Sequence, residues 1–142
     1  MRYLSNKEKK GLGDKIPTGY EINKKDELKQ KDNLLYLGDE PFLIILDDKY
    51  LPHLKSLKED CFKAVYVDHG AIPFILKGAD LMRPGITKIE EGFKADDVIL
   101  IKDEVHNKIL ACGIAMFDSN EMNEKTGGKV IKIYHYVSDE YY

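Results

Sequence analysis

From Ala64 onward the sequence is divided into short apolar runs, each of four to eight residues and closed by turn residues. Runs of this length suit β-strands, which commonly hold roughly 3 to 10 residues. Five or six such strands with one early helix predict a small closed or nearly closed β-barrel. The runs are Ala64–Val67, Val98–Ile101, Ile109–Met116 and Val130–Tyr136.

The one helix expected early in this part covers residues 70–77. Ile72, Ile75 and Leu76 have the spacing of a single helical face. Gly78 follows directly, and glycine readily adopts the left-handed conformation that ends many helices. A helix of about two turns is therefore expected, with Lys77 at its negative C-terminal end.

Two glycine-containing bends enclose the segment that follows this helix. Pro84 disfavours helical geometry at the residue before it, so Asp80–Arg83 is expected to be extended and Pro84-Gly85 to form a turn. Glycine backbone can approach a phosphate closely with its N–H groups pointing outward, and Lys77 and Arg83 flank the two bends. The simpler alternative is that the glycines only end a helix and permit a turn while both cations face water. The residues alone leave both interpretations open.

The N-terminal half combines a short helix with an apolar hairpin. Ser5 and Glu8 have the spacing of a capping box, and Gly11 limits the helix to about two turns. Leu34–Leu37 and Pro41–Leu46 are apolar runs joined by a tight turn that contains glycine. This pattern predicts a hairpin.

Two polar stretches separate the apolar elements. Residues 24–33 are almost wholly polar and are interpreted as a solvated connection or a fringe helical turn. The charged stretch Lys55–Asp60 marks the expected domain boundary. The fold class is therefore α+β, with a small N-terminal α/β domain over residues 1–60 followed by a mostly β pseudo-barrel over residues 61–142.

The charge balance limits how nucleic acid can be bound. Residues 1–60 hold 12 Lys/Arg and 12 Asp/Glu, and residues 61–142 hold 10 and 13, which gives the net charge of −3. Any contact with nucleic acid must therefore come from a local cluster rather than from a basic field over the whole domain. The longest apolar run, Phe42–Leu46, is too short to cross a bilayer, so a cytoplasmic location without membrane contact is expected.

The sequence contains no arrangement that suits catalysis, a metal or a bound cofactor. The four histidines are isolated, no Cys-x-x-Cys pair is present, and no glycine-rich nucleotide loop is found. Adjacent carboxylates such as Asp47-Asp48 would point in different directions on a strand and are interpreted as turn residues. Cys61 and Cys112 are expected to be reduced core residues. We therefore expect a protein that is not an enzyme and has no cofactor.

The order of motifs in the second half resembles the PUA domain, named for pseudouridine synthases and archaeosine transglycosylases. A strand leads into Asp68-x-Gly-Ala, a short apolar helix, and Gly78-Ala-x-x-Met-x-Pro-Gly-Ile. Two hydrophobic strands and a closing strand, Val130-x-Lys-x-Tyr-His-Tyr, complete the pattern. The stretch from Asp39 to Leu54 is similar to the end of the small domain that precedes PUA in archaeal relatives of the human malignant T-cell amplified sequence protein. The resemblance implies a PUA-type pseudo-barrel.

In PUA domains generally, the RNA groove runs along the first helix, the following glycine loop and the second strand, with help from the last strand. Carried over by position, the resemblance implies an RNA-binding set in this chain. Its members are Gly70, Lys77, Gly78, Ala79, Arg83, Pro84 and Gly85, with Lys132 and Tyr134 as weaker candidates. Tyrosines beside a lysine on the last strand can stack a base. The alternative is that they are half-buried barrel residues with their hydroxyls in water.

The resemblance implies a non-catalytic RNA-binding protein associated with translation. Eukaryotic relatives act with the density-regulated protein in initiation and in recycling of the small ribosomal subunit. The expected partners are tRNA or ribosomal RNA, the small subunit and a factor like the density-regulated protein. Two alternatives stay open: a protein-interaction adaptor in a ribonucleoprotein, and an accessory subunit of an RNA-modification complex. The negative net charge favours docking within a larger ribonucleoprotein.

Overall fold

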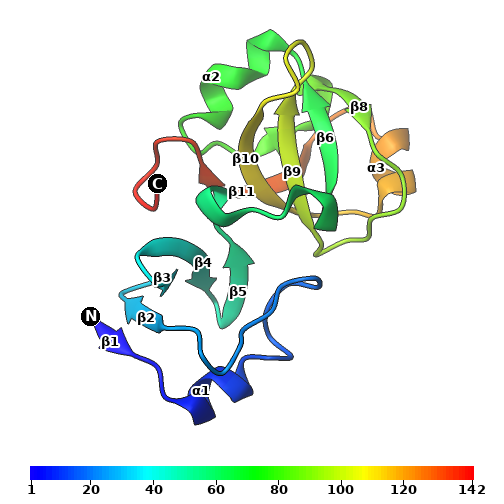
Figure 1. Cartoon of the computed structure of the whole chain (residues 1–142). Coiled ribbons are helices and arrows are strands. Elements are labelled where there is room, and N and C mark those ends of the chain that lie inside the picture. Colours follow the sequence, from blue (N-terminus) through cyan, green and yellow to red (C-terminus); the bar gives the residue numbers. More distant parts are fainter. The chain divides into compact units, whose positions relative to one another are not determined.

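The computed structural model describes residues 1–142, which form two compact units (Figure 1). The first unit holds Met1–Cys61 together with Tyr141, and the second holds Phe62–Glu140 together with Tyr142. Strands of one unit pair only with strands of the same unit. None of the helices has the length and apolarity that crossing a lipid bilayer would need.

The first unit is a sheet of five strands in the order β1-β2-β3-β4-β5, and each strand is antiparallel to its neighbours. The predicted hairpin is confirmed, because β3 and β4 pair with Leu35 opposite Leu43, and both side chains are fully buried. The strands are β1 (Arg2–Tyr3), β2 (Leu28–Lys31), β3 (Leu34–Leu37), β4 (Glu40–Leu46) and β5 (Lys49–Pro52).

The predicted N-terminal helix is confirmed as α1 (Asn6–Gly11). The Ser5 hydroxyl accepts from the Glu8 N–H at 3.2 Å, and the Ser5 N–H donates to the Glu8 carboxylate at 3.1 Å. Two main-chain donors at the helix start are thereby satisfied. The helix ends at Gly11, as its sequence predicts.

The interpretation of residues 24–33 as a solvated connection is wrong for β2. Leu28 lies in the core of the unit, and Lys29 is only 9% exposed. The Lys29 ammonium is 3.1 Å from Asp39 and 3.4 Å from Glu27, and the hydrogen bond to Asp39 raises its pKa. Lysine can pack in this strand because its aliphatic stem lies against the sheet while carboxylates meet its charge.

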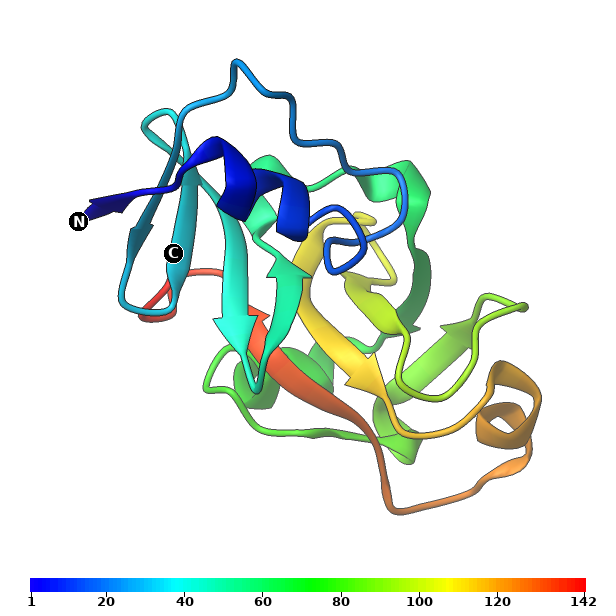
Figure 2. The same cartoon turned by 90° about the horizontal axis from the view of Figure 1, so that it is seen from below.

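The second unit is a six-stranded sheet in the order β7-β11-β10-β9-β6-β8, which curls on itself (Figure 1, Figure 2). Strands β6 and β9 are parallel, and the other pairs are antiparallel. The predicted α+β class with a mostly β pseudo-barrel is confirmed. The strands are β6 (Lys63–Val67), β7 (Leu81–Met82), β8 (Ile86–Ile89), β9 (Val98–Asp103), β10 (Ile109–Ala115) and β11 (Lys129–Tyr136).

Four short helices join these strands, and α2 and α3 lie well apart in both views (Figure 1, Figure 2). They are the 3₁₀ helix η3 (His69–Ala71), α2 (Ile72–Ile75), the 3₁₀ helix η4 (Arg83–Gly85) and α3 (Ser119–Glu124). The expected two-turn helix is therefore a 3₁₀ turn continued by one α-helical turn. Gly78 has φ +84°, so its predicted left-handed conformation is confirmed.

The core of this unit lies inside the curled sheet. Its apolar side chains come from all six strands, from α2 and α3, and from the loop before β9. Fully buried members include Val65, Ile75, Ile99, Ile101, Met122 and Ile131. The core thus holds α2 against the sheet through Ile75, and this fixes the position of the glycine bends.

The two cysteines have different environments, and neither forms a disulfide. Cys112 is fully buried in β10, as expected, and burial raises the pKa of its thiol to about 12. The expectation that Cys61 is a core residue is wrong, because Cys61 is exposed. It ends the 3₁₀ helix η2 (Glu59–Cys61), a single surface turn in which no residue is buried.

Candidate nucleic-acid interface

A cavity of about 360 Å³ lies beside α2 in the second unit. It is lined by residues from η3, α2, β7 and η4. Three residues of the predicted RNA-binding set are among them: Gly70, Pro84 and Gly85. The other six predicted residues are not part of this lining.

The two predicted bends are held together by hydrogen bonds around Asp68. Its N–H donates to the Gly85 carbonyl at 3.1 Å, and its carboxylate accepts from the Ala71 N–H at 3.0 Å. A Cβ atom on Gly85 would lie 3.1 Å from the Ala71 Cβ, which is closer than normal contact. A larger residue at Gly85 would therefore require η3 and η4 to move apart by a few tenths of an ångström.

The lining of the cavity is mainly apolar and includes large exposed side chains. Phe74 is 66% exposed and Met82 is 45% exposed, although both are large and hydrophobic. Asp68 and Asp80 contribute carboxylates, and no lysine or arginine belongs to the lining. The Asp80 carboxylate is already engaged, since it accepts from the Ile133 N–H at 3.3 Å and lies 3.8 Å from the Lys129 ammonium. The cavity therefore suits a flat apolar group better than a free anion.

The amide N–H groups of the turn after α2 do not point outward, contrary to the expectation from the sequence. The N–H groups of Lys77 and Ala79 both donate to the Phe74 carbonyl, at 3.2 and 3.1 Å, and the Gly78 N–H donates to Ile75 at 3.0 Å. The outward-facing amides expected at this bend are thus used to close the turn. What faces solvent is the Lys77 side chain, which is exposed and makes no ion pair.

Gly78 is required here for two reasons. Its φ of +84° is a conformation that residues with a Cβ atom rarely adopt. In addition, a Cβ atom would lie 3.0 Å from Cε1 of Tyr136. The turn that carries Lys77 is therefore packed against the end of β11.

Arg83 is engaged with main-chain oxygens rather than free in solvent. Its guanidinium donates to the carbonyls of Met122 at 2.9 Å, Ile86 at 3.2 Å and Asn123 at 3.4 Å. Three of its five N–H groups are thereby used, and two stay available for another acceptor. Arg83 thus fixes the end of α3 beside η4, and its plane is held in one orientation.

The two candidates on β11 differ in exposure. Lys132 is exposed, whereas Tyr134 is half-buried and its side chain is hydrogen-bonded to Cys112. The pairing of β10 with β11 shifts at this point, because Cys112 lies opposite His135 and Gly113 lies opposite Ile133. Tyr134 is therefore the extra residue of a β-bulge, and its environment agrees with the half-buried alternative.

Phe74 and Met82 were not among the residues predicted from the sequence. Phe74 falls outside the Ile72, Ile75 and Leu76 stripe, and this position would have indicated an exposed aromatic side chain on the helix. Met82 follows the buried Leu81 on β7, and strand alternation points it outward. Both signals are present in the sequence, but they are weaker than the glycines and cations beside them. No cluster of three or more His, Cys, Asp or Glu side chains that would suit a metal ion occurs in residues 1–142.

Residues 63–137, more than half of the chain, match the family described as the PUA domain. The chain belongs to the PUA-domain family. Residues 2–60 match a family described as a domain of unknown function (DUF1947). The PUA match covers every strand of the second unit, together with the cavity beside α2.

Curated relatives match a large part of this chain. An uncharacterized protein of Methanocaldococcus jannaschii is 41% identical over 75% of this chain and 67% of its own length. Translation machinery-associated protein 20 of Saccharomyces cerevisiae is 30% identical over 65% of this chain and 55% of its own. The malignant T-cell-amplified sequence 1 homolog of Drosophila melanogaster is 32% identical over 72% of this chain and 59% of its own length. The predicted relationship to that protein family is confirmed, and the chain spans 55% to 67% of the length of these relatives.

Solved structures extend the similarity to both units of this PUA protein. A hypothetical protein of Pyrococcus horikoshii is 31% identical, with a TM-score of 0.79 over 98% of this chain and 95% of its own. The structure of an H/ACA RNP bound to a substrate RNA contains a chain that is 29% identical, with a TM-score of 0.55. That match covers 67% of this chain and 29% of the other.

Proposed function

We propose that this PUA-domain protein is a non-catalytic RNA-binding protein of the translation machinery. In this proposal the cavity beside α2 holds an unpaired part of a structured RNA, either tRNA or small-subunit ribosomal RNA. The protein acts in the cytoplasm, during initiation or recycling, with the small subunit and a factor like the density-regulated protein as partners.

The observation that carries the proposal is an apolar cavity framed by glycine bends and by exposed Phe74 and Met82. Large exposed apolar side chains around a hollow mark a binding surface, and aromatic side chains that face solvent stack on bases. Lys77 lies three residues after Phe74, in the turn that follows α2, so its ammonium can meet a phosphate while Phe74 meets a base.

The proposed RNA-binding set contains every predicted residue and assigns different roles to its members. Gly78 and Gly85 hold the two bends in shape, Gly70 and Ala79 leave backbone open to the RNA, and Pro84 borders the cavity. Lys77 and Lys132 supply phosphate contacts, Arg83 offers its two remaining N–H groups, and Tyr134 supports β11. Phe74 and Met82 are added as base contacts. The set is Gly70, Phe74, Lys77, Gly78, Ala79, Met82, Arg83, Pro84, Gly85, Lys132 and Tyr134.

The relatives support this role through what their names state. The yeast relative is named for its association with the translation machinery. The H/ACA neighbour is a ribonucleoprotein with RNA bound. The two matches cover 65% and 67% of this chain.

Salt-titrated binding to total tRNA and small-subunit RNA tests the proposal with two single variants. Phe74→Ala should weaken binding roughly five- to hundredfold, since base stacking contributes about 1–3 kcal/mol, and should leave the salt dependence unchanged. Lys77→Ala should make the log-log salt slope shallower by about 0.7 to 0.9, because one phosphate contact is lost.

Val105→Ala and Lys108→Ala are matched controls, because both residues are exposed in the loop between β9 and β10. Neither control should alter affinity or slope by more than the experimental error. Absence of wild-type RNA binding near physiological salt would contradict the proposal and favour the adaptor alternative.

A further inference from the structure

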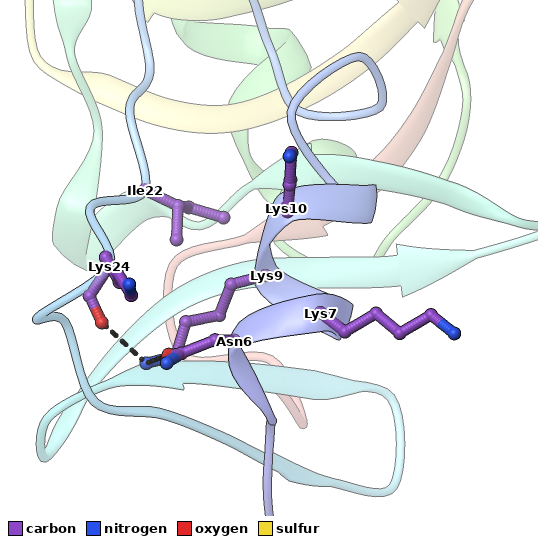
Figure 3. A pocket seen from close by; sticks show the side chains of 6 residues that line it. All are labelled: Asn6, Lys7, Lys9, Lys10, Ile22 and Lys24. Carbon is purple, nitrogen blue, oxygen red and sulfur yellow. Dashed lines mark hydrogen bonds between the residues drawn. The ribbon is translucent and has the colours of Figure 1, made fainter.

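The first unit contains a basic pocket of about 510 Å³ between α1 and the loop before β2 (Figure 3). Four of its six lining residues are lysines, and none is acidic. The lining is Asn6, Lys7, Lys9, Lys10, Ile22 and Lys24. The cavity beside α2 has no lysine in its lining, and the third described cavity has one, Lys94.

Lys9 holds the pocket together. Its ammonium donates to the Lys24 carbonyl at 3.2 Å and to the Asn6 side chain at 3.4 Å (Figure 3). These bonds join α1 to the loop that brings Lys24 beside it. One lysine is therefore used to build the pocket, and the ammonium groups of the other three make no hydrogen bond within it.

The remaining lysines have no counter-ions in this unit. Lys7, Lys10 and Lys24 are exposed and form no ion pair. The nearby carboxylate of Glu8 is committed to Arg2 at 2.6 Å, and Asp26 accepts from the Asn23 N–H at 2.8 Å. No carboxylate of the lining neutralises these three ammonium groups, so a polyanion is the ligand whose charge complements the pocket.

The directions of the lysines indicate the shape of the ligand. Figure 3 shows Lys7 and Lys10 leaving α1 in different directions, rather than converging on one point as a site for a single small anion would. No aromatic side chain belongs to the lining, and Ile22 is its only apolar member. Lysines are point charges that suit phosphates, so the pocket fits a chain of phosphates without reading bases.

We infer that this lysine pocket is a second RNA-contact surface, which binds the phosphate backbone of RNA independently of sequence. The inference rests on the proposed function, because it assigns the first unit to the same ligand class. It gives this unit a binding role of its own, separate from the cavity beside α2.

A triple variant, K7Q/K10Q/K24Q, tests the inference in the full-length protein with poly(U) and total tRNA as probes. Lys9 is kept so that α1 stays joined to the loop. The matched control is K31Q/K49Q/K108Q, three exposed lysines outside the pocket. Each triple variant removes three positive charges, which changes the net charge from −3 to −6.

The pocket variant should bind both RNAs at least about tenfold more weakly near 0.1 M salt. Its slope of log affinity against log salt should be shallower by up to roughly two units, because each phosphate contact with single-stranded RNA contributes about 0.7 to that slope. The control should behave as the wild type. Equal affinity and slope for the two triple variants would overturn the inference, while wild-type binding that depends on Phe74 would leave the proposed function intact.

Two further outcomes are decisive. Weaker binding to poly-glutamate with unchanged RNA binding would overturn the inference and assign the pocket to an acidic protein segment. Absence of RNA binding by the wild type would overturn the proposed function together with this inference.

Discussion

At the scale of single residues, Arg83 has a structural role that is compatible with the RNA-binding role we propose for it. Three of its N–H groups bind carbonyls of α3 and β8, which lie 3 to 40 residues away in the chain. A guanidinium held in this way has already lost most of its rotational freedom. It can therefore offer its remaining donors to a phosphate without a further ordering cost.

Replacement of Arg83 should reduce stability as well as RNA binding. Arg83→Ala removes three hydrogen bonds to a charged donor and should lower the free energy of unfolding by about 2 kcal/mol. Urea denaturation measures this change. The exposed Lys132→Ala is the control and should stay within about 0.5 kcal/mol of the wild type. An Arg83→Ala variant as stable as the wild type would show that these carbonyl contacts contribute nothing.

At the scale of elements, the sequence predicts the helix caps, hairpins and turns that depend only on residues close together in the chain. The capping box, the hairpin and the left-handed Gly78 each follow from local spacing and are present in the structure. Strand β2 is missed because Leu28 is its only apolar residue, and Lys29 is accommodated by Asp39 ten positions away. The local sequence pattern around Lys29 does not show that Asp39 will be its partner.

The candidate site likewise has features that the sequence predicts and features that depend on the fold. The glycine bends are visible in the sequence, and the structure brings Gly70, Pro84 and Gly85 to one cavity. The contact of Arg83 with α3 spans 39 residues and depends on how the sheet curls. The N–H groups after α2 turn inward because the chain closes on Phe74, a choice that sequence spacing does not determine.

The turn between β9 and β10 provides a pH-dependent element. The Asp103 carboxylate accepts from the N–H groups of Val105 and His106, each at 2.8 Å. The bond from His106 is the largest influence and lowers the pKa of Asp103; burial opposes it, and the bond from Val105 lowers the pKa further, so the pKa lies below its usual value. A lowered pKa stabilises the fold above the unfolded-state pKa of about 4, and this stabilisation is lost as the pH falls through the folded-state value.

Asp103→Asn should therefore be less stable than the wild type at pH 7, and the difference should shrink as the pH falls below about 4. Denaturant unfolding between pH 3 and pH 7 measures it. Glu104→Gln, at the exposed neighbouring residue, should show no such pH-dependent difference. A gap between Asp103→Asn and the wild type that is the same at pH 3 and pH 7 would contradict the assignment.

At the scale of the whole molecule, the chain has a net charge of −3 but carries local concentrations of lysine and exposed apolar groups. Such a protein is not attracted to RNA over its whole surface. In our proposal, binding comes from two local surfaces, the cavity beside α2 in the second unit and the lysine pocket in the first. Contacts of this kind favour a ribonucleoprotein in which several weak surfaces act together.

We propose that the two units are independent domains. The core cluster of the second unit contains only its own residues, and its sheet includes no strand of the first. A fragment of residues 62–140 should unfold cooperatively, with a single melting transition and a dispersed amide NMR spectrum. A fragment without a cooperative transition would show that the second unit depends on the first.

The most direct measurement of the central claim is ultraviolet cross-linking of the full-length protein to tRNA and small-subunit RNA, followed by mass spectrometry of the tryptic peptides. We expect nucleotide adducts in residues 64–77 and 78–88, which contain Phe74 and Met82, and expect Phe74→Ala to reduce the first. Adducts confined to other strands of the second unit, with both of these peptides unmodified, would contradict the proposal that the cavity beside α2 holds RNA.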